Sequence, residues 1–259
     1  MESISTRVAI CCIAKDEDRY IDEWIEYHLG LGFDKIYVFR DDWDWVGRKD
    51  YGGRVVSGNA LRVENPQVPM YNHFLSNYGA IYDWVLFIDV DEFLVLKNHD
   101  SVKSYLKAHS GNRSIGVNWV LFGSKECNHG AKNTVIDDER VEIDSEKGVI
   151  DRFRYRQRGV NPHVKCFMRC GVETRMLNPH FGNEEWLGSD GRHHWGAFCY
   201  DGNDKEAYIA HFFTKSWPEW CEKRDRGRPD SCEKRGDDDF YKHDLNEIYE
   251  HVGSYKRNC

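Results

Sequence analysis

Short apolar runs alternate with a helical stripe near the start of the chain, and this alternation limits the folds that the sequence can adopt. Residues 7–14, RVAICCIA, predict a strand, and KIYVFRDD predicts a second one. Between them, YIDEWIEYHLGLG places apolar side chains at intervals near three and four, which predicts a helix that ends at Gly30 and Gly32. This order is typical of a βαβ unit with parallel strands.

The later segments continue the pattern. We predict a helix over residues 70–82, a second in HDSVKSYLKAH and a third that begins in SWPEWCEKRDRG, with Pro218 in its first turn. Further strands are expected in GRVVSGNALRVEN, WVLFIDV, SIGVNWVLFG, VKCFMRC and AYIAHFFTKS. Near-continuous apolar strands indicate a sheet covered by helices on both faces. The predicted class is therefore α/β, with a mixed, mostly parallel, Rossmann-like sheet.

The bulk composition excludes some classes of protein. With 259 residues, of which 40% are hydrophobic, the chain can bury a large core, and no linker divides it. A net charge of −8 argues against nucleic acid as the main partner, because phosphate binding needs clustered basic residues. The charged end of the chain, residues 229–259, predicts a solvated helical tail.

The cysteines and the apolar runs indicate the cellular compartment in which the protein is expected. Nine cysteines without a CxxC pair indicate neither a disulfide framework nor a zinc ribbon, and they favour a reducing, cytoplasmic location. His180, His193 and His194 lack the spacing of a zinc site. The run VAICCIA is too short to span a membrane and lacks a signal-peptide pattern, so we expect a soluble protein without its own membrane segment.

Carboxylates interrupt the apolar stretch DWVLFIDVDEFLVL. Asp89 and Asp91 alternate along an extended chain, so they share a side, whereas Glu92 points the other way and is expected to orient the loop. Two carboxylates that project together suit Mg²⁺ or Mn²⁺. Acidic residues also follow the first two strands, at 15–18 and 41–42, and in a parallel sheet all three clusters meet at one rim. For those two clusters, ordinary turn or capping chemistry is an equally good explanation.

Four blocks of the sequence, taken in order, resemble a known family. ICCIAKDEDRYIDEWIEYHLGLGFDKIYVFRDD, DWVLFIDVDEFLVL, VNWVLFGS and HFFTKSWPEWCEKRDRG are similar to the main blocks of small GT-A glycosyltransferases of the family 2-like and family 92-like groups, which include viral and bacterial members. The resemblance covers most of residues 7–228. It implies one GT-A domain over 1–259, with a nucleotide-binding half at about 7–96 and an acceptor-side half at about 97–228.

The resemblance also implies a donor site. The nucleotide would be held by Ala14, Lys15 and Glu17 with Asp41 or Asp42, although the family has Asn-Glu where this chain has Asp16-Glu17. Asp89 and Asp91 would bind Mn²⁺ or Mg²⁺ at the diphosphate of a nucleoside diphosphate sugar. His211 would be a third ligand, although by itself it is an ordinary strand-end histidine. Lys215 and Ser216 would meet phosphate oxygens where a helix begins.

The implied reaction is an inverting sugar transfer, with a UDP-sugar favoured as donor and a glycan or other hydroxyl as acceptor. Asp190 is the candidate general base, and Glu126 and Asp138 are rivals, although an ordinary loop residue is the better explanation for each. Trp119, Trp186 and Trp195 are candidates for stacking on acceptor sugars, with core packing as the alternative. Two other functions remain open: an inactive nucleotide- or sugar-binding module, and a metal-dependent phosphohydrolase or nucleotidyltransferase.

Overall fold

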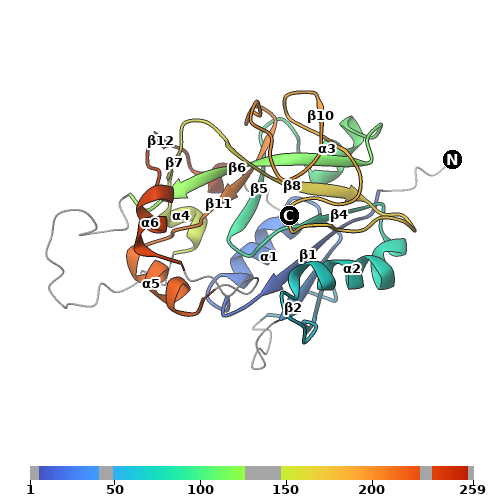
Figure 1. The fold of residues 1–259 in the computed structure, drawn as a ribbon, viewed down its shortest axis with the longest axis horizontal. Helices are drawn as coiled ribbons and strands as arrows, with labels where there is room; N and C mark the ends of the chain where they lie inside the picture. The colour runs from blue at the N-terminus through green and yellow to red at the C-terminus, as the bar shows by residue number, and fades with distance from the viewer. Residues whose placement is uncertain (1–5, 41–48, 126–146, 228–234, 256–259) are drawn as a thin grey trace, which may run out of the picture.

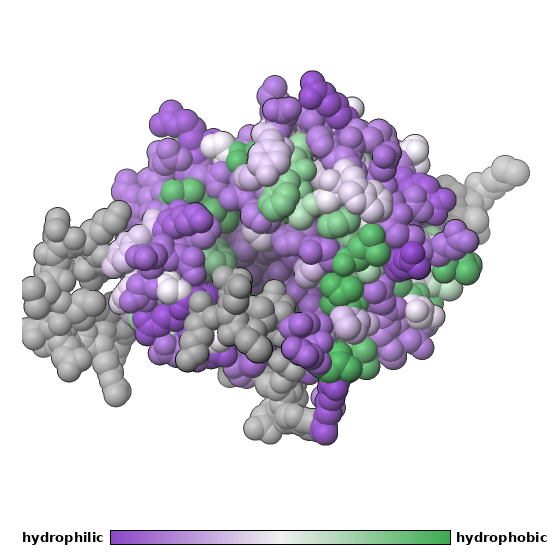
Figure 2. All heavy atoms as spheres, in the orientation of Figure 1, coloured by the Kyte–Doolittle hydropathy of each residue, from purple (hydrophilic) through white to green (hydrophobic). Residues whose placement is uncertain are grey.

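The protein is a mixed α/β domain in which helices flank a central sheet (Figure 1). The computed structural model describes residues 6–40, 49–125, 147–227 and 235–255. The face drawn in Figure 2 is largely hydrophilic, with separate apolar patches. The α/β class predicted from the alternation of strands and helices is confirmed.

The first half of the sheet is parallel, as the βαβ pattern predicts. Its strands lie side by side in the order β3, β2, β1, β4, with every neighbouring pair parallel. Their bounds are Val8–Ala14 for β1, Lys35–Arg40 for β2, Val55–Asn59 for β3 and Trp84–Phe87 for β4. The carboxyl ends of these strands therefore meet at one edge.

The second half of the sheet is mixed. The long strand β8 pairs antiparallel with both β4 and β6, and β11 lies between β6, to which it is parallel, and β5, to which it is antiparallel. Short strands complete the edges. The bounds are Glu92–Leu96 for β5, Ser114–Gly123 for β6, Tyr155–Arg156 for β7, Asn161–Arg169 for β8, Trp186–Leu187 for β9, His193–His194 for β10, Ala207–His211 for β11 and Ile248–Tyr249 for β12.

Strand β1 is buried on both faces, which explains its unbroken apolar sequence. Ile10 and Cys12 belong to the core packed under α1 and α3, whereas Ala9 and Cys11 belong to the core packed under α2. The adjacent cysteines thus face opposite ways, as expected, and both are free thiols. The helices run over Ile21–Gly30 for α1, Gln67–Tyr78 for α2 and Val102–Ala108 for α3, with a 3₁₀ turn, η1, at Gly79–Ile81.

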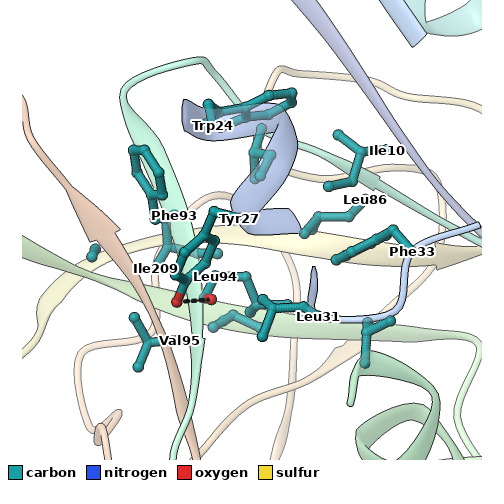
Figure 3. Close-up of a cluster of buried hydrophobic side chains, with 14 of the residues drawn as sticks. Ile10, Trp24, Tyr27, Leu31, Phe33, Leu86, Phe93, Leu94, Val95 and Ile209 are labelled. Atoms are coloured by element: carbon teal, nitrogen blue, oxygen red, sulfur yellow. Dashed lines mark hydrogen bonds between the residues drawn. The ribbon is translucent and has the colours of Figure 1, made fainter. Parts of the chain in front are cut away.

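Helix α1 fixes the start of β5, which follows the acidic turn. The indole Nε1 of Trp24 donates to the backbone oxygen of Glu92 over 2.7 Å. The Tyr27 hydroxyl donates to the backbone oxygen of Leu94 over 3.0 Å, a bond drawn in Figure 3. His28 Nε2 accepts from the Leu94 N–H, so its Nδ1–H donates to the Trp24 carbonyl. Burial lowers the pKa of His28 to about 3, so the ring is neutral and can make both bonds.

The charge pattern of the last segment predicts a solvated helical tail, but the described part of this segment, residues 235–255, folds back onto the sheet. Helix α6, Asp237–His243, is short, and β12 pairs antiparallel with β7. Glu250 binds Arg156 and accepts from the Tyr208 hydroxyl, so its charge is satisfied internally. The remaining elements are α4 at Val149–Arg152, α5 at Trp217–Asp225 and the 3₁₀ turn η2 at Val252–Tyr255. Across the described segments, none of the helices is long and apolar enough to cross a membrane.

Candidate active site

A cavity of about 370 Å³ opens at the carboxyl ends of β1 and β4, and it forms the hollow visible in Figure 2. This size lies within the range of small-molecule sites. Its wall collects residues from distant parts of the chain, including the acidic turn after β4 and the end of β11. The charged, polar and aromatic residues of the lining include Lys15, Glu17, Gln67, Asp89, Asp91, Trp119, His163, Lys165, His180, His211, Lys223, Arg226 and Asp239.

Asp89 lies in the turn between β4 and β5 and is held by two donors. Its Oδ1 accepts from Gln67 over 2.8 Å, and its Oδ2 pairs with the buried Lys165 over 2.9 Å. Strand β4 ends at Phe87, so the acidic residues do not alternate along an extended strand as the sequence pattern predicts. A turn brings Asp89 and Asp91 to the cavity instead, and the expectation that they share one site is met by a different backbone geometry.

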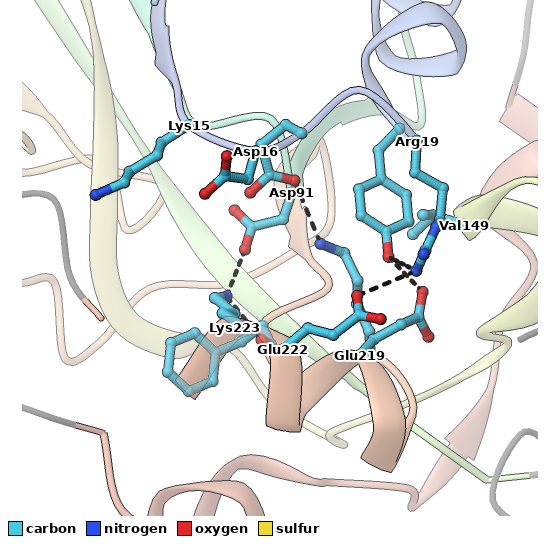
Figure 4. Close-up of polar contacts among 12 residues, drawn as sticks. Lys15, Asp16, Arg19, Asp91, Val149, Glu219, Glu222 and Lys223 are labelled. Carbon is cyan, nitrogen blue, oxygen red and sulfur yellow. Dashed lines mark hydrogen bonds and ion pairs between the residues drawn. The ribbon is translucent and has the colours of Figure 1, made fainter. Parts of the chain in front are cut away.

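Asp91 is the more deeply buried of the two aspartates. Its Oδ2 accepts from Lys223 Nζ over 2.7 Å, and its Oδ1 lies 3.6 Å from Nε2 of His211 (Figure 4 draws the lysine contact). Burial raises the pKa of Asp91, but Lys223 and His211 outweigh burial and hold it well below its ordinary value. Burial also lowers the pKa of Lys223 to about 8. Near neutral pH the site therefore contains a buried carboxylate held by a lysine.

Glu92 stands behind His211. Its Oε1 lies 4.0 Å from His211 Nδ1, and within the described part of the chain neither atom has a hydrogen-bond partner. Its Oε2 accepts from the backbone N–H of Asp89 over 2.9 Å, which agrees with the loop-orienting role expected for Glu92. Burial raises the pKa of Glu92 and lowers that of His211, so the ring is neutral and can present Nε2 as a ligand.

These groups fit a hard divalent cation in part. A histidine whose far nitrogen faces a carboxylate is the usual support for a metal ligand, and Glu92, His211 and Asp91 are arranged in that order. Asp91 Oδ1 and His211 Nε2 would hold the ion. Each oxygen of Asp89 accepts one hydrogen bond, from Gln67 or from Lys165, and keeps a second lone pair with which Asp89 could join the ion.

The loop after β1 borders the cavity through Lys15 and Glu17. Arg226 binds the Lys15 and Asp16 carbonyls over 2.6 and 3.0 Å and pairs with the Glu17 carboxylate over 2.5 Å. Asp16 has a φ of 52°, a left-handed conformation that is strained for a non-glycine residue. Ala14, at the end of β1, is buried and is not part of the lining.

The phosphate contact predicted at the start of α5 is not supported. Glu219 caps this helix by accepting from the N–H and hydroxyl of Ser216, and it is paired with Arg152. An anion therefore already occupies the helix N-terminus. Lys215 lies outside the lining, with its Nζ 3.9 Å from the centre of the Tyr20 ring and 3.7 Å from Glu17 Oε2.

The three tryptophans proposed for acceptor binding have different surroundings. Trp119 lines the cavity, and its ring centre lies 4.8 Å from that of His163 and 4.4 Å from that of His211. Trp186 is fully buried, so the acceptor role is wrong for it and core packing is correct. Trp195 is 58% exposed and is not among the lining residues.

The candidate bases are not at the cavity in the described part of the chain. Asp190 is bound to His194 over 2.9 Å and is absent from the lining, so the structure does not support it as a base. Glu126 and Asp138, and likewise Asp41 and Asp42 of the nucleotide site, lie outside the described residues.

Sequence reasoning missed the basic side of the cavity. Lys165 interrupts the apolar run of β8, and a lysine inside a buried strand is a signal that could have been used. Lys223 and Arg226 sit in and just after a highly charged helix, where nothing distinguishes them from solvated residues. Gln67, at the first position of α2, carries no sequence signal either.

The chain combines a mixed α/β sheet with a carboxylate-bearing cavity at the ends of its parallel strands, and part of it is similar to glycosyltransferases. Residues 63–181 match the family model described as glycosyltransferase family 92. A glycosyltransferase family 92 protein of Ricinus communis is 26% identical over 47% of this chain, and one of Oryza sativa subsp. japonica is 25% identical over 42%. The matched parts span only 24% and 20% of those relatives. The chain is thus similar to glycosyltransferase family 92 proteins over part of its length.

Proposed function

We propose that this protein transfers a sugar from a nucleoside diphosphate sugar, with a UDP-sugar favoured, to a hydroxyl of a glycan or other acceptor. The observation that carries the proposal is the Glu92, His211, Asp91 array inside a cavity that also contains buried lysines. Trp119 gives the cavity an aromatic wall beside this array, against which a sugar acceptor could pack. The similarity to family 92 supports the same class.

The cationic residues of the cavity suit a diphosphate. Lys165, Lys223 and Arg226 are each paired with a carboxylate. When a metal ion and a diphosphate bind, the carboxylates could pair with the metal and the cationic side chains with the phosphate oxygens. A bound Mn²⁺ or Mg²⁺ would be held by Asp91 and His211 and would neutralise charge on the leaving diphosphate. Lys223, displaced from Asp91, would then reach a phosphate oxygen.

The acceptor would lie against Trp119, whose indole Nε1 is buried without a hydrogen-bond partner in the described structure. Inversion requires a base for the acceptor hydroxyl. Of the described carboxylates that line the cavity, Asp239 is the one that makes no ion pair, and its side chain only caps the N–H of Gly236. Asp239 is therefore the first residue to test as the base.

A product analysis separates the candidate reactions. Purified protein is incubated with UDP- and GDP-sugars, with and without Mn²⁺, and the products are resolved by chromatography. Slow transfer to water gives a nucleoside diphosphate and a free sugar, whereas a pyrophosphohydrolase gives a nucleoside monophosphate and a sugar phosphate. We expect the first pair, with Mn²⁺ required. Nucleotide binding without any product would favour the binding-module alternative. Asp239→Asn should abolish transfer to an acceptor and leave donor binding intact.

A further inference from the structure

Three metal-binding residue types converge away from the cavity, beside the hairpin formed by β9 and β10. Asp190 lies in the hairpin turn, His194 ends β10, and Cys199 follows in the next loop. One ligand atom from each lies within 4.8 Å of the other two. The Cys199 sulfur is 3.7 Å from His194 Nε2, and this nitrogen is 2.9 Å from Asp190 Oδ1.

The orientation of the ring excludes a catalytic triad. In a nucleophilic triad the carboxylate and the nucleophile bind opposite nitrogens of the histidine. Here the sulfur and both oxygens of Asp190 face the same nitrogen, Nε2. The three side chains therefore direct their ligand atoms to a common point, as they would around one bound metal ion.

We propose that Asp190, His194 and Cys199 bind a zinc ion, which leaves a fourth coordination position for water or another ligand. Tetrahedral zinc with a thiolate and an imidazole separates its ligand atoms by about 3.3–3.8 Å, close to the sulfur-to-nitrogen distance found here. A thiolate with an imidazole favours Zn²⁺ over Mn²⁺ or Mg²⁺, which take oxygen ligands. The site is thus chemically distinct from the aspartate cavity.

The surroundings prepare these side chains for a metal. The His194 ring stacks on the buried Trp186, with ring centres 4.8 Å apart. A Cβ at Gly188 would lie 2.6 Å from Asp190 Oδ1 and 2.8 Å from His194 Cδ2, so the backbone closes one side of the site.

The metal would connect the hairpin to the main sheet. The Cys199 N–H donates to the Pro162 carbonyl over 2.7 Å, and its own carbonyl accepts from Asn118 over 3.0 Å. Phe198 pairs with His163, a lining residue of the cavity. Zinc would therefore fasten the loop that supports this wall.

The test uses the full chain and zinc alone. Protein purified without chelator is dialysed against metal-free buffer, and its zinc content is measured by mass spectrometry and by competition with a chromophoric chelator. We expect one zinc per chain. Cys199→Ser should weaken zinc binding more than ~100-fold, because a direct ligand matters more than an outer-shell partner. Cys170→Ser is the matched control and should bind like the parent, since Cys170 lies outside the cluster.

A second readout keeps the test independent of folding. Co²⁺ added to the zinc-free parent protein should give a thiolate-to-cobalt charge-transfer band, and Asp190→Asn, which preserves shape, should weaken cobalt binding without removing the band. Absence of both zinc and the band from the folded parent protein would overturn the proposal. So would zinc binding that Cys199→Ser leaves unchanged. Neither result would count against the proposed glycosyl transfer, because that proposal rests on cavity residues, and Asp190, His194 and Cys199 are not among them.

Discussion

Lys223 Nζ donates a 2.7 Å hydrogen bond to Oδ2 of Asp91, the carboxylate whose other oxygen faces His211. The lysine occupies the position of a counter-cation, and both side chains are only 9% exposed. Because a metal at Asp91 would compete with the lysine, the pair links metal binding to the release of a positive charge inside the cavity.

Asp91→Asn should abolish metal-dependent transfer and also destabilise the fold, because it leaves the Lys223 charge buried without its partner. The expected loss is about 3 kcal/mol in the free energy of unfolding, measured by urea denaturation. The double variant with Lys223→Met should recover most of this stability and remain inactive. Activity retained in either variant would refute the metal role of Asp91.

Glu92→Gln should weaken Mn²⁺ binding in the presence of UDP by about 10- to 100-fold, because the amide cannot become the anion that supports the His211 ring once a cation is bound beside it. Calorimetric titration of the metal measures the change. Glu185→Gln, at an exposed position, is the matched control. Equal affinities in the two variants would mean that Glu92 acts on the turn alone, through its bond to the Asp89 N–H.

Strands and helices could be predicted where buried residues recur with a regular period. Side chains that reach the site only through tertiary contacts could not be predicted. The alternation of strands and α1 predicted the parallel half of the sheet, because a strand buried on both faces must be apolar throughout. The apolar run before Asp89 likewise predicted an acidic site at the strand ends. Lys223 could not be predicted as a site residue, because its helix is charged on most sides. Only its hydrogen bond to Asp91, which depends on the tertiary fold, distinguishes it from the other charged residues. Trp186 was misassigned since a tryptophan in a Gly-rich segment has no periodicity to reveal its burial.

Trp119→Ala should raise the KM for the acceptor severalfold, because the half-buried indole forms the aromatic wall of the cavity. Trp119→Phe should recover part of the loss. Trp195→Ala, at an exposed position outside the lining, should leave the KM unchanged and serves as the control. If Trp119→Ala, Trp119→Phe and Trp195→Ala all lowered kcat equally and left the KM for the acceptor unchanged, the acceptor would not bind against Trp119.

Glu219 should make stability depend on acidic pH. Burial raises the pKa of this carboxyl, but hydrogen bonds and charge from Arg152, with Ser216 and Tyr20, outweigh burial and lower it from 4.5 to about 2. Since the folded pKa lies below the unfolded one, the ionised group stabilises the fold fully above pH 4.5 and loses this contribution as pH falls towards 2. The shift corresponds to about 3 kcal/mol.

Glu219→Gln removes this titration and should flatten the decline of stability in that interval. The variant will be less stable than the parent at pH 7, because Arg152 loses its partner, but the difference between the two should shrink as the parent is acidified. Urea unfolding of both proteins between pH 7 and about 3 measures it. A difference that stays constant over this interval would show that Glu219 has the same pKa in both states and that the ion pair with Arg152 does not govern acid stability.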